Sequence, residues 1–129
     1  LGAYLLKGGF LIEDDTRTER GNEWATFAYH MERPLPGLSL TPLEHDHRIL
    51  DSFSQIEPLK VIPPYGPRNP QWYGIFENND PTQRLMVVFN FNNDIAEYCE
   101  YSDQGYYPID LSNEAYKLGV NYIVYGHTH

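Results

Sequence analysis

Histidines and carboxylates stand side by side at two places in the sequence. Residues 44–47 read Glu-His-Asp-His, and residues 126–129 read Gly-His-Thr-His. Imidazole nitrogens and carboxylate oxygens are common ligands of zinc, iron and manganese in proteins. The two stretches could therefore build one metal site, provided that the fold brings them together.

The second stretch closes a predicted helix that begins near Asp110, where Asp110 or Ser112 can cap the free backbone N–H groups. The predicted buried face of this helix is a stripe formed by Leu111, Ala115, Leu118 and Tyr122. At about 100° per residue, His129 falls on this face and His127 on the opposite one. The two histidines therefore cannot share a metal ion if the helix continues to the end.

The direction of that helix also argues against a combined site. A helix that covers a parallel sheet runs antiparallel to its strands, so its end lies at the far edge from the carboxyl ends of the strands. Residues 44–47 directly follow a predicted strand and should lie at the carboxyl edge. The sequence thus predicts that the two histidine stretches are separated by roughly 17–20 Å, the length of a strand.

Polar side chains follow three predicted strands. Residues 10–12 and 84–91 are apolar runs, and residues 38–43 alternate, with Pro42 typical of a short or edge strand. The candidate site residues after these strands are Asp14, Asp15, Asp46, His47 and Asp94. If the strands are parallel, these side chains gather at the carboxyl edge, where open α/β sheets bind ligands. Tyr106 is a candidate wall of this ligand site.

Each of these clusters also has a purely structural interpretation. Asp46 could cap the turn at Ile49–Leu50, with one histidine packed against it. Asp14 and Asp15 could cap the element that follows their strand, and Asn93–Asp94 is typical of a turn. The residue types alone do not decide between capping and binding.

The functional interpretation of the same residues has two forms. The first is a ligand site without catalysis, and we expect no cofactor in that case. The second is a divalent metal held by His47, Asp15 and Asp94, which would activate water for hydrolysis. Cys99 is a poor candidate nucleophile, because neighbouring acids should raise its pKa and no glycine-flanked elbow surrounds it.

The remaining elements complete an open sheet. Residues 24–31 repeat apolar side chains at helical spacing, whereas residues 58–70 hold five prolines and should form a long loop. Residues 71–76 and 84–91 are strands separated by a polar turn, so we expect a hairpin. Helices alternating with strands in this order indicate an α/β fold with an open sheet.

Composition limits the classes of partner. The net charge is −9 with the nine basic residues spread singly, which argues against binding to nucleic acid. No apolar run approaches the roughly 20 residues that a membrane span requires. We expect residues 1–129 to form a single domain. Because residues 1–6 read as the end of a helix stopped by Gly8-Gly9, we also expect residues before Leu1 to be missing.

Five stretches resemble, in order, an uncharacterised bacterial family known as Domain of Unknown Function 4159: AYLLKGGFLIEDD, DHRILDSF, YGIFENN, RLMVVFNFNND and YKLGVNYIVYGHTH. The resemblance spans essentially the whole chain and corresponds to the later two-thirds of the family domain. It implies a flavodoxin-like open, mostly parallel sheet with helices on both faces, related to class I glutamine amidotransferase-like domains. The family pattern matches Asp14, Asp15, Asp46, His47, Asn93 or Asp94, and Thr128-His129.

What the resemblance implies about activity is limited. Amidotransferases need a cysteine on a strand-to-helix elbow, and residues 1–129 contain no such elbow. Family members often carry export signals, which implies a periplasmic or envelope location. Our leading hypothesis is therefore a ligand- or protein-binding module of the bacterial envelope, or a subunit of a larger assembly. The alternative hypothesis is the metal-dependent hydrolase.

Overall fold

The computed structural model describes residues 1–16, 23–56, 62–66 and 69–129, and the side chains of Asp15 and Thr16 lie outside this description. The helices and strands, in chain order, are α1 (Gly2–Leu6), β1 (Leu11–Thr16), α2 (Glu23–Glu32), β2 (Thr41–Pro42), the 3-10 turn η2 (Arg48–Asp51), β3 (Gln71–Phe76), the 3-10 turn η4 (Glu77–Asn79), β4 (Leu85–Phe91), α3 (Ile95–Glu100) and α4 (Ile109–Thr128). No helix in the described residues is long and apolar enough to cross a membrane.

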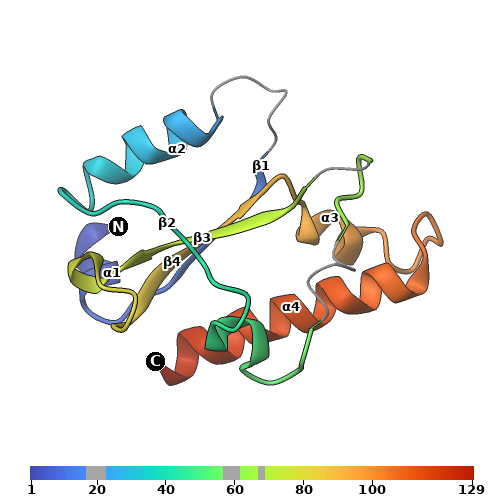
Figure 1. Cartoon of the computed structure of the whole chain (residues 1–129). Helices are drawn as coiled ribbons and strands as arrows, with labels where there is room; N and C mark the ends of the chain where they lie inside the picture. Colours follow the sequence, from blue (N-terminus) through green and yellow to red (C-terminus); the bar gives the residue numbers. More distant parts are fainter. Residues whose placement is uncertain (17–22, 57–61, 67–68) are drawn as a thin grey trace.

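The four strands form one open, mixed sheet in the order β1-β4-β3-β2 (Figure 1). β1 pairs with β4 in parallel, whereas β3 pairs antiparallel with both β4 and β2. We call the edge at which β1 and β4 end the carboxyl edge, and the edge at which they begin the amino edge. Because β3 runs the other way, its last residue Phe76 lies at the amino edge, paired with Leu85.

Helices cover both faces of this sheet. On one face α4, α3 and η2 pack through a core that includes Leu50, Val88 and Leu118. On the other face α1 and α2 pack through a smaller core that includes Leu5 and Met31. Figure 1 shows α2 on one side of the sheet and α4 on the other, so the sheet is the middle layer of three.

Local sequence explains the tight β3–β4 hairpin, through the turn at Asn78 and Asn79 and the close packing at Gly74. The β3–β4 connection turns through Asn78 and Asn79, which both have a φ of 56°, a conformation that asparagine tolerates better than most residues. In β3, Gly74 allows close packing, because a Cβ there would lie 2.2 Å from Leu85 Cδ1. The hairpin therefore closes tightly and places the antiparallel strand β3 between β2 and β4.

Several sequence predictions are confirmed. α2, the short edge strand β2, the β3–β4 hairpin and the final helix all lie where the sequence predicts them. Of the predicted stripe on the final helix, Ala115, Leu118 and Tyr122 are buried. The Pro-rich loop is described only at residues 62–66 and 69–70, which contain no helix or strand.

Other predictions need correction. The sheet is mixed rather than mostly parallel, because the hairpin brings an antiparallel strand into its middle. β1 extends to Thr16, so Asp14 and Asp15 lie within the strand and not after it. The cap of α4 is Pro108 without a side-chain hydrogen bond, and neither Asp110 nor Ser112 takes that place. The sequence analysis also missed α3 entirely.

Candidate functional site

At the carboxyl edge, Asp14 supports the start of α3. Its Oδ1 accepts a hydrogen bond from Asn90 Nδ2 at 3.0 Å, and its Oδ2 accepts one from the backbone N–H of Ala96 at 2.9 Å. A carboxylate next to the first N–H groups of a helix is a stabilising arrangement. Asp14 thus has a structural role of the kind that the capping interpretation predicts, but at α3 and not at the next element in the chain.

Asp94 is the N-cap of the same helix. Its Oδ1 accepts the backbone N–H of Glu97 at 2.9 Å, which is the usual contact of a capping aspartate. Tyr106 lies beyond the other end of α3, is 70% exposed and contacts the ring of Tyr101. The described part of the carboxyl edge therefore brings Asp14 and Asp94 together but places Tyr106 elsewhere, and the side chain of Asp15 lies outside the described residues.

A buried tyrosine extends this polar group into the core. Tyr122 of α4 donates a hydrogen bond to Asn90 Oδ1 at 2.6 Å, and Asn90 in turn bonds to Asp14. Burial, followed by the nearby negative charge of Asp14, raises the pKa of Tyr122 well above its usual value. Tyr122 therefore stays protonated, and its hydroxyl donates the hydrogen bond to Asn90 that links α4 to β4.

His47 lies at the amino edge, far from Asp14 and Asp94. The backbone N–H of His47 bonds to Glu44 O at 3.0 Å, so residues 44–47 turn the chain back after β2. The ring of His47 consequently packs against Phe76, with 5.7 Å between the ring centroids. Since Phe76 pairs with the beginning of β4 and Asp14 bonds near its end, roughly 17 Å of strand separate the two places.

The two histidine stretches meet at this edge, and the prediction that they lie apart is wrong. His47 packs on Tyr125 of α4, and His129 stacks on the same ring at 4.4 Å between centroids. Arg48 Nη1 lies 3.1 Å from His129 Nε2. The end of α4 does lie at the amino edge as predicted, but the turn at residues 44–47 brings His47 there as well. His127 points to the opposite side of α4 and is exposed.

A polar hollow of about 550 Å³ opens between these side chains. It is lined by Asp46, His47, Arg48, Pro81, Thr82, Gln83, Arg84, Tyr125 and His129. Arg84 is held there by Glu77 at 2.7 Å and by the carbonyl oxygens of Leu5 and Gly9. The charge of Arg84 is therefore matched within the protein, whereas Arg48 lines the hollow next to His129.

The capping role of His47 weighs against metal binding. Its Nδ1 accepts the backbone N–H of Ile49 at 3.2 Å, so the neutral ring carries its proton on Nε2. Ligation of a metal through Nε2 would move that proton to Nδ1, where it would face another donor. Burial, followed by the charge of Arg48, lowers the pKa of His47 and so favours the neutral ring that accepts this bond. Among the described residues, no group of three or more histidine, cysteine, aspartate or glutamate side chains could hold a metal ion.

Cys99 is a half-buried side chain of α3 with a raised pKa. The main cause is burial, and the charge of Asp14 adds to it, so the flanking glutamates are not responsible. The direction of the predicted shift is confirmed. A thiol that is mostly protonated near neutral pH is a weak nucleophile, which agrees with the absence of an elbow in the sequence.

The largest feature that the sequence analysis missed is the outer face of α4. The outer face is formed by Ile109, Asn113, Tyr116, Val120, Ile123 and His127. At 3.6 residues per turn these residues share a stripe roughly 80° wide, opposite the buried stripe. Ile109 is 79% exposed and Ile123 is 57% exposed. The alternating spacing of four and three residues could have revealed this second stripe in the sequence.

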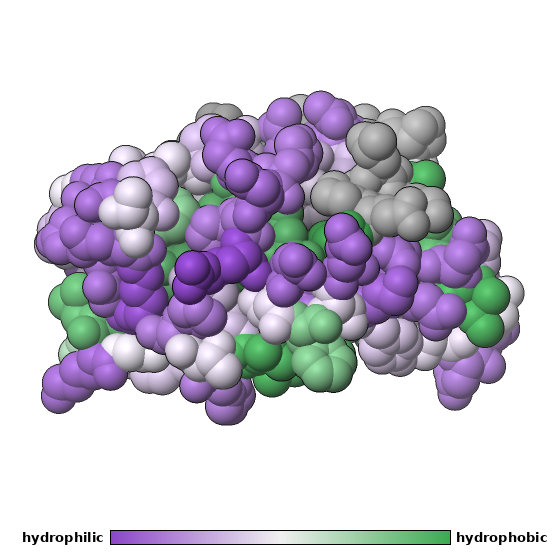
Figure 2. Space-filling view, turned by 60° about the horizontal axis from the view of Figure 1, so that its bottom comes forward, coloured by the Kyte–Doolittle hydropathy of each residue, from purple (hydrophilic) through white to green (hydrophobic). Residues whose placement is uncertain are grey.

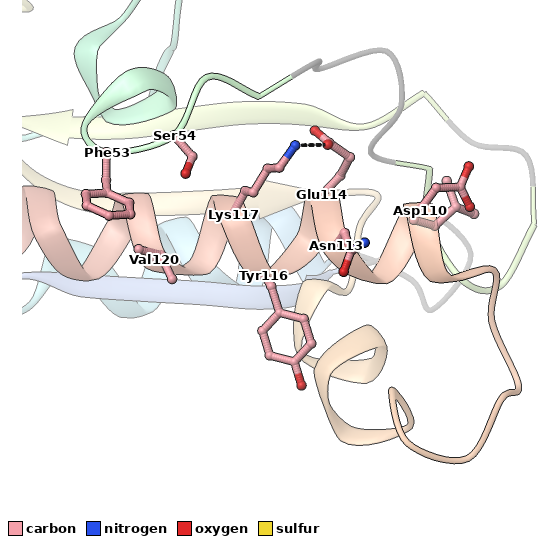
Figure 3. Close-up of a pocket in the computed structure, with 9 residues that line it drawn as sticks. Phe53, Ser54, Asp110, Asn113, Glu114, Tyr116, Lys117 and Val120 are labelled. Atoms are coloured by element: carbon pink, nitrogen blue, oxygen red, sulfur yellow. Dashed lines mark hydrogen bonds and ion pairs between the residues drawn. The ribbon is translucent and has the colours of Figure 1, made fainter.

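Phe53 enlarges the apolar surface next to this stripe. It is 74% exposed and helps line a hollow of about 440 Å³, together with Val120 and Tyr116 (Figure 3). The buried side chain of Asn121 fixes this segment: its Oδ1 accepts the N–H groups of Phe53 and Ser54, and its Nδ2 donates to the carbonyls of Leu50 and Ser54. The backbone at Phe53 is therefore held in place at the surface, with the ring exposed.

Charged groups border the same surface. Among the described residues, the cation that lines the hollow is Lys117, which pairs with Glu114 at 2.6 Å (Figure 3). Asp110 also lines the hollow and is exposed. The hydroxyl of Tyr116 lies 2.8 Å from Ser102 Oγ, next to the exposed Asp103. Figure 2, which brings forward the side of the molecule that carries α4, shows hydrophobic residues in separate patches among hydrophilic ones.

Comparisons with known proteins place the chain in a family without giving it a function. No curated protein and no solved structure matches the chain. A match to the family described as "Domain of unknown function (DUF4159)" covers residues 1–126. This chain therefore belongs to the DUF4159 family.

Proposed function

We propose that this domain is a non-catalytic protein-binding module and that the outer face of α4, together with Phe53, is its binding surface. The observation that carries the proposal is the row of exposed apolar side chains on a helix whose opposite face is fully used by the core. Contiguous apolar patches that are rimmed by polar groups mark interaction sites.

The polar side chains that were candidates for catalysis support the proposal, because they are already hydrogen-bonded to the backbone. Asp14 and Asp94 bond to the first turn of α3, and His47 bonds to the first turn of η2. A catalytic group must be available to a substrate, whereas these side chains hold backbone N–H groups. A hydrolase centred on His47 would have to give up its cap, so we prefer the binding role to the metal-dependent alternative.

Two further parts of the proposal rest on the family resemblance. A flavodoxin-like ancestry agrees with the parallel β1–β4 pair and the helices on both faces, although the sheet as a whole is mixed. An envelope location, and a place as a subunit of a larger assembly, come from the resemblance alone.

The test is site-specific photocrosslinking in the cells that produce the protein. A benzoylphenylalanine at position 123, in place of Ile123, should give one adduct of defined mass with another protein. The matched control carries the same photoreactive group in place of Tyr29, which is 77% exposed on α2. The reporter at position 29 should give no such adduct.

A second substitution tests whether the adduct reports a specific surface. Val120→Asp on the outer face should abolish crosslinking from position 123 while the domain stays folded. Equal adduct patterns from positions 123 and 29, or an adduct that survives Val120→Asp, would contradict the proposed binding surface.

A further inference from the structure

We infer that the partner presents a basic amphipathic helix, which packs along the outer face of α4. The inference rests on the proposed function and adds the chemical class of the partner. It is carried by three observations: the spacing of the exposed stripe, the hollow beside it and the charges at its border.

The spacing of the stripe is that of a helix–helix seam. Ile109, Tyr116 and Ile123 follow one another at intervals of seven residues, and Val120 lies between the last two. A repeat of four and three residues keeps one face of a helix turned toward a second helix. The stripe from residue 109 to residue 127 is about 27 Å long, so it could contact about five turns of a partner helix.

The hollow beside the seam fits a single large side chain. It lies between Phe53 and the Tyr116–Val120 part of α4 (Figure 3) and has a volume of about 440 Å³. The hydrogen bonds of Asn121 hold the backbone of Phe53 and Ser54 at one side of the hollow, while the exposed ring of Phe53 can adjust to a side chain that enters. A backbone that is already in place reduces the conformational entropy lost on binding.

The charges at the border favour a cationic partner. The chain has a net charge of −9, and the exposed acids next to the stripe are Asp51 close to Phe53, Asp103 close to Tyr116, and Asp110. Lys117 is already paired with Glu114. A partner with Lys or Arg beside its apolar residues would meet these carboxylates, and complementary charge favours both encounter and register.

The same charges argue against two other occupants. A second copy of the chain would bring its own charge of −9 to the seam. A bilayer surface attracts helices that carry several Lys or Arg residues on the polar face, whereas on this face Lys117 stands beside acids. A basic helix avoids both conflicts.

The probe for the test is a synthetic helix of about 20 residues with Leu at the seam positions and Lys elsewhere. Its affinity for the folded domain is measured by isothermal titration calorimetry, beside a control peptide in which Glu replaces Lys. The variants are Ile123→Asp on the outer face and Tyr29→Asp on α2, which make the same gain of negative charge at two exposed apolar positions.

We expect the Lys peptide to bind the wild-type domain and Tyr29→Asp alike, and to bind Ile123→Asp at least tenfold more weakly. The added carboxylate strengthens any general attraction to a cation, so a loss at position 123 must come from the seam. The Glu peptide should not bind. Circular dichroism confirms that both variants keep their helix content.

Other results would overturn the inference. Equal binding by the two variants would mean general attraction between opposite charges, and equal binding of the two peptides would remove the role of charge. No binding of either peptide would make the partner class wrong, while a crosslinked adduct from position 123 would still support the protein-binding function. A dimer in sedimentation velocity that Ile123→Asp dissociates would assign the surface to a second copy, and binding to phosphatidylglycerol vesicles would assign it to a membrane.

Discussion

The two faces of α4 carry apolar side chains in almost equal measure, yet only one of them is explained by the fold. The inner face packs Ala115, Leu118 and Tyr122 against the sheet, and each of these side chains is fully buried. The outer face leaves Ile109 and Ile123 more than half exposed. Exposed apolar side chains contribute little to folding, so the outer row points to a role beyond stability.

The polar groups on the two faces differ in the same way. Inside, Tyr122 bonds to Asn90, and Asn121 bonds to the backbone of residues 50–54. Such contacts hold the elements together and leave few groups available for a substrate. Outside, Asp110 and Lys117 line the hollow next to Phe53 and Val120. The inner face therefore builds the domain, and this contrast supports the proposal that the outer face binds a partner.

The largest expected effect separates the two faces by truncation. Leu118→Ala should lower the free energy of unfolding by about 2–5 kcal/mol, because it opens a cavity in the core. Ile123→Ala should change it by about 0.5 kcal/mol or less, since the side chain is already in solvent. Urea unfolding of both variants measures the difference. A loss at Ile123 as large as that at Leu118 would show that the outer face is buried in the isolated protein, most simply in a dimer.

A second pair of variants tests the polar groups. Tyr122→Phe removes the hydroxyl that donates to Asn90 in the core, and the unfolding free energy should fall by about 1–3 kcal/mol. Tyr116→Phe removes a hydroxyl near Ser102 at the surface, where water replaces it, and should cost about 0.5 kcal/mol or less. Equal costs in urea unfolding would mean that the outer tyrosine is also structurally required.

The periodic spacing of apolar residues predicted the longer helices well, because side chains that are buried against a sheet must recur on one face of a helix. The apolar spacing of residues 24–31 and the stripe of α4 follow from packing against a sheet, and both predictions are confirmed. The hairpin was predictable because two apolar runs flank a short polar turn. α3 was missed because it has only six residues, of which just Ile95 and Tyr98 are buried, so that its pattern is too short to detect.

The prediction of the site failed at a turn and not at the strand directions. β1, β2 and β4 do run the same way, because β3 pairs antiparallel with both β2 and β4. However, the turn at residues 44–47 reverses the chain after β2, and His47 therefore lies near Phe76 at the amino edge. Tertiary contacts of this kind leave no trace in local spacing, whereas the exposed stripe of α4 is a local pattern of four and three residues that the sequence itself contains.

A smaller difference in unfolding free energy is expected between an acid that caps α3 and an acid that only lies in the first turn of α4. Asp94→Ala should lower the unfolding free energy by about 1 kcal/mol, because Asp94 Oδ1 accepts the N–H of Glu97. Asp110→Ala should lower the unfolding free energy by no more than about 0.3–1 kcal/mol, since Asp110 lies in the first turn of α4 without capping it. Thermal unfolding followed by circular dichroism gives both values. If Asp110→Ala were the more harmful, the border of the outer face would have to be regarded as part of the fold.

The smallest expected effect concerns the pH dependence of the cap at His47. The pKa of His47 is lowered from its usual 6.5 in the folded protein, mainly by burial. The unfolded chain therefore binds the proton more readily, and the contribution of His47 to stability is fully present above about pH 6.5 and is lost as the pH falls below it. Because the side chain is only partly buried, we expect a loss on the order of a few tenths of a kcal/mol. His47→Asn keeps a side-chain acceptor for Ile49 N–H but does not titrate, so its urea midpoint should fall less than that of the wild type between pH 7 and pH 5. Parallel midpoints over that range would show that Nδ1 does not cap η2, and the argument against a metal ion on His47 would then lose its main support.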